Sequence, residues 1–130
     1  MPTPERRLAR LLETKSYPGL RLLLLFGSRA RGDAKAAADW DLAYLASAPF
    51  DADGLLADLA GAIGADRIDL VDLSRAGGQL RYRAARDGRV LFEVRPREFE
   101  RFWLDAVSFW CDVAPVVGRA YEGVLSRLER

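Results

Sequence analysis

The chain contains no histidine and a single cysteine, Cys111. The missing histidine excludes catalytic serine–histidine and cysteine–histidine pairs, and it excludes every metal site that depends on imidazole ligands. A lone cysteine excludes an internal disulfide and a multi-cysteine zinc site. Any enzymatic chemistry of this chain must therefore come from carboxylates, hydroxyls, backbone amides and the cationic side chains of arginine and lysine.

Long hydrophobic runs and a strong charge of either sign are also missing. The longest apolar run, Leu22–Phe26, is far too short to cross a membrane, and the N-terminal segment MPTPERRLAR lacks the apolar core of a signal peptide. The 20 basic and 19 acidic residues leave a net charge of +1, whereas a dedicated nucleic-acid binder usually has a strong basic excess. We therefore expect a cytoplasmic protein that contacts no membrane and binds no nucleic acid directly.

The sequence does contain enough apolar material for one core. Half of its 130 residues are hydrophobic and no repeat or linker divides it, so we predict a single domain over residues 1–130, with a core at about 20–94 and a helical segment at about 96–130. Alternating segments predict an α/β (α+β) fold, a small mixed β-sheet covered by helices with a C-terminal helical tail. The expected strands cover residues 20–26, 40–46, 67–73 and 90–94. Helices are expected at residues 4–15, from a cap at Asp51 or Asp53 to about Ile63, from a cap at Ser74 across Leu80 and Tyr82, and from Pro96 onward. A short helical turn is also expected from a cap at Ser28 to Arg31.

Two carboxylates, Asp39 and Asp41, stand two residues apart at the second expected strand. Alternate strand residues share a face, and like charges held side by side are accepted most readily when a cation lies between them. Asp69 in the third strand would add a carboxylate to the same face, whereas Asp72 would face the other way. Oxygen ligands suit Mg²⁺, so Asp39, Asp41 and Asp69 predict a site for two Mg²⁺ ions roughly 4 Å apart.

A Gly-Ser turn directly after the first strand completes the pattern. Gly27 lets the backbone approach a ligand closely, Ser28 opens a helical turn whose free N–H groups attract phosphate, and Arg29 and Arg31 add positive charge. These parts predict a nucleoside-triphosphate site in which an acceptor hydroxyl attacks the α phosphorus, with Asp69 as the candidate to help deprotonate the acceptor. An isolated Asp-x-Asp on a strand is more often a solvated polar face, but the combination favours a site.

The order of these residues resembles the nucleotidyltransferase superfamily typified by DNA polymerase beta. The superfamily pattern is an apolar residue, a glycine, a glycine or serine, a spacer, and then aspartate and apolar residues in alternation. Here it reads FGS at residues 26–28, ten intervening residues, and DWDL at residues 39–42. The small size, and the stretches IDLVDL and RDGRVLFE within residues 68–93, resemble the minimal nucleotidyltransferase (MNT) branch.

The resemblance implies a nucleotidyltransferase fold and a specific activity. Stand-alone MNT proteins commonly serve as antitoxins, each paired with a HEPN-domain toxin that is an RNase. The resemblance thus implies that this chain uses ATP and Mg²⁺ to transfer AMP onto a tyrosine of a cognate HEPN toxin, which silences it in a hetero-oligomer. Gly27, Ser28 and Arg29 would then bind the nucleotide. Two alternatives stay open: nucleotide transfer to a small-molecule hydroxyl, and a non-catalytic module that only binds its partner.

Residues 99–128 hold a large share of the aromatic side chains. One apolar stripe predicts a helix packed on the sheet, but the aromatics spread over more than one helical face, which indicates a second surface that would pack against a partner or a second copy of the chain. Pro115 is expected to kink or end this helix, because it cannot donate its backbone hydrogen bond, and a further helical piece is expected to run to Leu128. The aromatic residues of this tail are Phe99, Phe102, Trp103, Phe109, Trp110 and Tyr121.

Overall fold

The structure, a computed structural model, describes residues 3–32, 39–64 and 67–117. Helices and strands alternate along these residues, as the sequence predicts. No helix among them is long and apolar enough to span a membrane. The elements in chain order are α1 (Pro4–Thr14), β1 (Leu20–Phe26), α2 (Gly27–Arg31), β2 (Trp40–Ala46), α3 (Ala52–Ile63), β3 (Ile68–Asp72), α4 (Gly78–Asp87), β4 (Arg89–Glu93) and α5 (Glu98–Val117).

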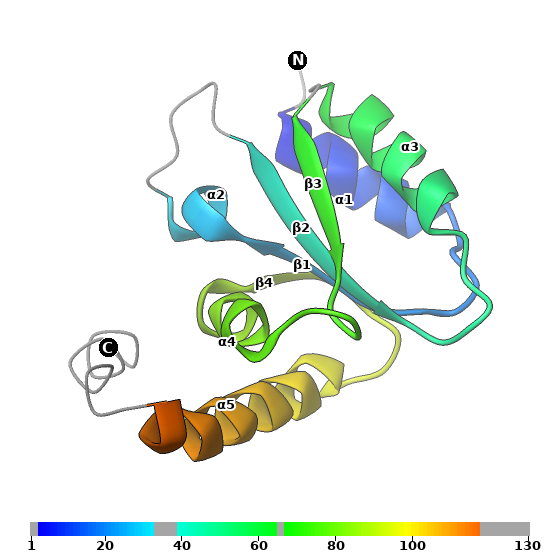
Figure 1. The fold of residues 1–130 in the computed structure, drawn as a ribbon. Helices are drawn as coiled ribbons and strands as arrows, with labels where there is room; N and C mark the ends of the chain where they lie inside the picture. The colour runs from blue at the N-terminus through cyan, green and yellow to red at the C-terminus, as the bar shows by residue number, and fades with distance from the viewer. Residues whose placement is uncertain (1–2, 33–38, 65–66, 118–130) are drawn as a thin grey trace.

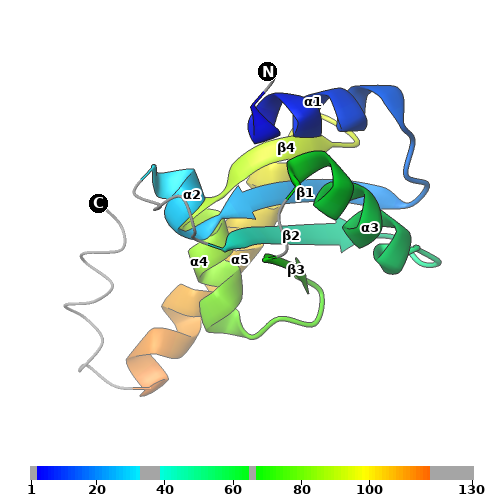
Figure 2. The ribbon, with the colours of Figure 1, turned by 90° about the horizontal axis from the view of Figure 1, so that it is seen from above.

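The four strands form one mixed sheet in the order β3-β2-β1-β4. β1 pairs antiparallel with both β2 and β4, whereas β3 runs parallel to β2. Figure 2 shows α1 and α3 on one face of the sheet and α4 and α5 on the other, with the short helix α2 at the end of β1. Figure 1 shows the same arrangement from the side. The predicted mixed sheet with helical cover is confirmed.

Both faces of the central strand β1 are buried, which explains why its sequence is almost wholly apolar. Leu23 and Leu25 point into the core under α1 and α3, whereas Leu22 and Leu24 point into the core under α4 and α5. The neighbouring strand β2 divides in the same way, with Leu42 on the first side and Ala43 on the second. This alternation decides which face each polar residue of β2 and β3 shares with its neighbours.

Two helix starts differ from the predicted caps. α2 begins at Gly27 with Phe26 as its N-cap residue, so Ser28 lies inside the helix and does not cap it. α4 begins at Gly78 after the N-cap Gly77. Ser74 instead closes a turn, because its backbone N–H and its hydroxyl both donate to Asp72 Oδ1, at 2.9 and 2.6 Å. A serine can satisfy a turn as well as a helix end, so Ser74 marks the turn that precedes α4.

The bounds of the four strands agree with the prediction to within one residue. Of the two predicted caps of α3, Asp51 is the one found, since its side chain accepts a hydrogen bond from Gly54 N at 2.9 Å. Pro115 does not end the helix, because α5 continues through it to Val117; the expected kink at Pro115 stays a prediction. Pro115 lies in the last described turn, where it removes only one intrahelical hydrogen bond. The second helical piece expected up to Leu128 lies outside the described residues.

The aromatic stripe of α5 is divided between the core and the surface. Phe102 and Ala106 are buried under the sheet, and Trp110 stacks on Tyr82 of α4 with ring centroids 5.8 Å apart. Among the side chains of α5 that the structure describes, three large apolar ones remain exposed: Trp103, Leu104 and Phe109. One stripe of α5 therefore packs on the chain's own core, as expected, and the other faces outward.

Glu98 is expected to be the most costly carboxylate of the fold to remove. Its side chain is 1% exposed and accepts hydrogen bonds from Arg21 of β1 at 3.2 Å and from Arg95 at 2.9 Å. Burial acts to raise the pKa of Glu98, but these two arginines outweigh it and hold the pKa below its ordinary value. Glu98→Ala should lower the free energy of unfolding in urea by about 2 kcal/mol, because it removes a buried carboxylate that accepts charge-assisted hydrogen bonds from two arginines.

Glu100 provides the control for Glu98. It lies two residues further along α5, and its contact with Arg97 at 3.8 Å is exposed on both sides. Glu100→Ala should change the unfolding free energy by less than about 0.5 kcal/mol. Equal losses for the two variants would contradict the buried role of Glu98.

Candidate nucleotidyl-transfer site

The Gly-Ser turn after β1 meets the Asp41 carboxylate at one end of the sheet. The last residue of β1, Phe26, is paired with Asp41 of β2. Gly27 follows with a φ of +74°, in the left-handed region that favours glycine. A Cβ atom placed on Gly27 would overlap Asp41 Oδ2 and lie 3.2 Å from Asp41 Cγ. The turn therefore needs glycine both for its backbone angle and for its contact with the carboxylate.

The strand register places Asp69 beside Asp41. Asp41 is the direct partner of Asp69 in the parallel pair of β2 and β3. Asp41 precedes Ala43 by two residues and Asp69 precedes Val71 by two, and both of these apolar residues pack in the core under α4 and α5. Asp41 and Asp69 therefore share the face that α4 covers, because side chains alternate along a strand. The expectation that Asp69 shares a face with Asp41 is confirmed.

Asp39 lies just before β2, where Trp40 N donates to Arg67 O at 2.9 Å and joins the beginnings of β2 and β3. Its carboxylate is 60% exposed and lies 4.0 Å from the Arg67 guanidinium. A cavity of about 290 Å³ opens here, lined by Asp39, Arg67, Ile68 and Asp69. Within the described residues, no three acidic or cysteine side chains are already gathered around a common point as a metal centre.

The electrostatics of Asp41 are those of a crowded anionic site. Burial raises the pKa of Asp41 above its ordinary value, and the negative charges of Asp69 and Asp39 raise it further. The positive charges of Arg83 and Arg31 act in the opposite direction without cancelling the rise. Ionising the Asp41 carboxyl therefore costs more in the metal-free protein than in water, and a bound cation would offset that cost.

The arginines near the turn point to different sides. The Arg29 guanidinium lies over the ring of Trp40, 4.3 Å from its centroid, and Trp40 belongs to the core under α1 and α3. Arg31 lies at the other end of α2 and, together with Arg83 of α4, acts on the carboxylate side of the sheet. Sequence reasoning did not single out Arg83, because no local motif marks an exposed arginine in a helix 42 residues after Asp41.

Asp72 is separate from this site, as its position in β3 predicts. It follows Asp69 by three residues and therefore faces the other side of the sheet. Its carboxylate closes the turn to Ser74 and lies 3.8 Å from the exposed guanidinium of Arg75. It takes no part in the carboxylate group of β2 and β3.

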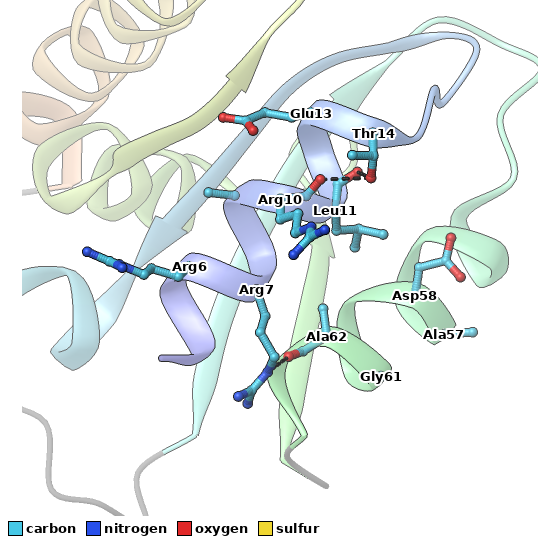
Figure 3. Close-up of a pocket in the computed structure, with 11 residues that line it drawn as sticks. Arg6, Arg7, Arg10, Leu11, Glu13, Thr14, Ala57, Asp58, Gly61 and Ala62 are labelled. Carbon is cyan, nitrogen blue, oxygen red and sulfur yellow. Dashed lines mark hydrogen bonds between the residues drawn. The ribbon is translucent and has the colours of Figure 1, made fainter. Parts of the chain in front are cut away.

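A larger hollow, of about 1010 Å³, lies between α1 and α3 (Figure 3). Its arginines, Arg6, Arg7 and Arg10, come from α1, and Arg7 reaches across to donate to the carbonyls of Ala62 and Ile63 at 2.6 and 3.0 Å. These bonds satisfy carbonyls at the end of α3. The hollow is a groove between two helices that cover the opposite face from Asp41, so it is not part of the carboxylate site.

The family model described as "Polymerase beta, Nucleotidyltransferase" matches residues 8–97 of the chain. Among curated proteins, the chain is similar to protein adenylyltransferase MntA of Aphanizomenon flos-aquae (strain 2012/KM1/D3). The two are 37% identical over 110 residues, which is 75% of this chain and 72% of the relative.

Solved structures of toxin–antitoxin complexes have the same fold. A chain of a toxin–antitoxin crystal structure with AMP-PNP has a TM-score of 0.69 and 26% identity, over 97% of this chain and 98% of that one. A chain from the complex of a tri-AMPylated Shewanella oneidensis HEPN toxin with its MNT antitoxin has a TM-score of 0.64 and 25% identity, over 98% and 97% of the two chains.

Proposed function

The chain belongs to the polymerase beta nucleotidyltransferase family, and on this premise we propose that it is the antitoxin enzyme of a HEPN/MNT pair. It transfers AMP from ATP onto a HEPN-domain toxin and thereby neutralises it. The observation that carries the proposal is the packing of the Gly27 backbone against Asp41, with Asp69 beside it in register. The similar Aphanizomenon protein is named a protein adenylyltransferase, and a similar chain is found with an AMPylated toxin.

Asp39, Asp41 and Asp69 are the residues that we assign to Mg²⁺. Their side chains offer only oxygen donors, which Mg²⁺ prefers. Burial raises the pKa of Asp41, and the negative charges of Asp69 and Asp39 raise it further, which supports a role for a cation at this point. Two ions suit three carboxylates that face a triphosphate. When bound, Mg²⁺ would neutralise phosphate charge and polarise the reacting phosphoryl group. The residues present therefore fit the metal that the family implies.

The turn after β1 is the element that we assign to the triphosphate. The backbone of Gly27 lies against Asp41, and the half-buried Ser28 follows it; the Gly27 backbone and the Ser28 hydroxyl would hold phosphate oxygens. Arg29 enters the proposal as the residue that fixes the turn, since its guanidinium lies over Trp40, and as a nearby positive charge. Arg31 and Arg83 provide positive charge on the carboxylate side.

The proposed reaction joins a hydroxyl oxygen of the toxin, in our proposal a tyrosine oxygen, to the α phosphorus of ATP. The bond from the α phosphorus to the oxygen that bridges the α and β phosphates breaks, and pyrophosphate leaves. Asp69 is exposed and open to an incoming partner, so it is the residue that we assign to accept the hydroxyl proton. The chain's main contribution is to position the two reactants and to balance their charge.

Two samples of ATP, one labelled on the α phosphate and one on the γ phosphate, test this reaction. Each is incubated with the chain, Mg²⁺ and the purified HEPN toxin. The proposal predicts that the α label moves to the toxin and that the γ label leaves with pyrophosphate. Label appearing only on a small molecule would favour the small-molecule alternative. A stable complex in which the toxin takes up no label would favour the non-catalytic binding module.

A further inference from the structure

The short helix α2 has little that could stabilise it alone. It contains five residues, Gly27–Arg31, and no side chain caps its first turn. Isolated helices of this length are unstable in water, because the cost of nucleation exceeds the gain from a few hydrogen bonds. The position of α2, and of the turn that begins it, must therefore come from contacts with the rest of the chain.

Two arginines attach α2 to its surroundings, one on each face of the sheet. Arg29 lies over Trp40 on the side of α1 and α3. Arg31 reaches the other side, where its Nη1 donates to Asp87 Oδ2 at 3.1 Å. Asp87 is the last residue of α4, which packs against α2.

Asp87 is itself held firmly in place. Its side chain is 8% exposed, and the neighbouring Arg86 donates from Nε to Oδ1 at 2.8 Å and from Nη2 to Oδ2 at 2.7 Å. Such a two-pronged contact fixes the direction of a carboxylate as well as its position. Burial acts to raise the pKa of Asp87, but the hydrogen bonds and charges of Arg86 and Arg31 outweigh it and keep the carboxylate ionised.

We propose that Asp87 is a positioning residue of the nucleotide site: it holds Arg31 beside the carboxylates and fixes the end of α2, so that the Gly27-Ser28 turn and the Arg31 charge are in place before the triphosphate binds. The inference rests on the proposed function, because it assumes that this turn binds ATP. Without the Asp87 charge, the guanidiniums of Arg31 and Arg86 repel each other, and Arg31, which is 41% exposed, turns into solvent.

Asp87→Asn tests the role of Asp87 directly. We expect the KM for ATP, and the dissociation constant of ATP in the presence of Mg²⁺, to rise about tenfold, because a charge-assisted anchor of a phosphate-binding element is lost. The kcat should change by less than about threefold, since a contact made equally in the ground and transition states affects KM alone. A loss of stability without loss of ATP affinity would overturn the proposal.

Asp58→Asn is the matched control. Asp58 also accepts from two side chains, Lys15 and Tyr17, the latter at 2.8 Å, but it joins the α1 side of the molecule to α3, away from the carboxylates. Its removal should leave the KM for ATP unchanged. A rise equal to that of Asp87→Asn would show that losing any such carboxylate weakens ATP binding, and the proposal would fail.

A double-mutant cycle shows whether Asp87 acts through Arg31. Arg31→Ala should weaken ATP binding, and adding Asp87→Asn to it should have little further effect. Independent, multiplying effects would contradict the proposed route. If Asp87→Asn does not fold, Arg31→Gln tests the same contact from the other side, with a raised KM for ATP expected and a wild-type KM overturning the proposal. A wild-type chain that binds no ATP would overturn the proposed function as well, whereas equal binding by wild type and variant overturns only the role of Asp87.

Discussion

Asp41→Asn is expected to abolish AMP transfer, by about a thousandfold or more, and to make the metal-free protein more resistant to heat. The two effects have one origin. The Asp41 pKa is raised in the folded protein by burial and by Asp69 and Asp39, so the ionised carboxylate is less favourable in the folded state than in the unfolded state. At neutral pH, replacing the charge with a neutral amide removes this penalty, along with a ligand that the metal needs.

Thermal melts and transfer rates of the same samples measure both effects of Asp41→Asn. Without metal, the melting temperature of the variant should lie above that of the wild type. Mg²⁺ should raise the melting temperature of the wild type more than that of the variant, because only the wild type has the full set of ligands. The control is Asp53→Asn, which changes an exposed residue of α3 and should retain full transfer. Wild-type transfer by Asp41→Asn would show that the metal assignment is wrong.

Gly27→Ala is the second large effect that we expect. Alanine would have to adopt a φ of +74°, and its Cβ would overlap the Asp41 carboxylate. The backbone angle alone costs roughly 1–2 kcal/mol for a residue with a side chain. Displacing Asp41 should also lower the transfer rate by at least about a hundredfold, because small errors in positioning have large effects on such chemistry.

Gly32→Ala separates these two causes. Gly32 ends α2 with a φ of +82°, but a Cβ atom there would meet no atom of the described residues within 4 Å. It should therefore share the loss of stability, measured by chemical denaturation, and keep most of the transfer activity. If Gly32→Ala loses activity as severely as Gly27→Ala, the contact between the turn and Asp41 is not what makes Gly27 necessary.

The parts of the fold that could be predicted from the sequence are those set by local pattern. The run from Leu20 to Phe26 has apolar residues on both alternating faces, and both faces are indeed buried. The place of Asp69 in its strand was enough to predict that it shares a face with Asp41. Asp39 lies just before β2, so its place on that face stays a prediction. The register that makes Asp41 and Asp69 direct partners required the structure.

Helix starts were predicted less well, because several residues near each start are able to form a cap. Ser28 and Ser74 both have suitable side chains, yet α2 begins at Gly27 and α4 at Gly78. At Ser74, the backbone N–H and the hydroxyl both donate to Asp72 Oδ1, and α4 begins four residues further on, at Gly78. Which of several polar residues caps a helix depends on where the chain turns, and this is decided by packing.

Contacts between individual side chains of helices far apart in the sequence could not be predicted. Arg31 and Asp87 are 56 residues apart, and their meeting depends on α4 packing against α2. Arg29 was expected at the nucleotide because of its place beside Ser28, but its guanidinium lies over Trp40. An aromatic residue in the Asp-x-Asp motif looks like a simple apolar substitution in the sequence, whereas in the structure it fixes the side chain of a neighbouring arginine.

The central claim is that this chain attaches AMP to its HEPN partner through the carboxylates of β2 and β3. The most direct measurement is the intact mass of the purified toxin after incubation with ATP, Mg²⁺ and either the wild-type chain or Asp41→Asn, both verified as folded. The account predicts that the toxin gains the mass of one or more AMP units with the wild type and gains none with the variant. An unchanged toxin mass with the wild type, or an equal gain with both chains, would contradict it.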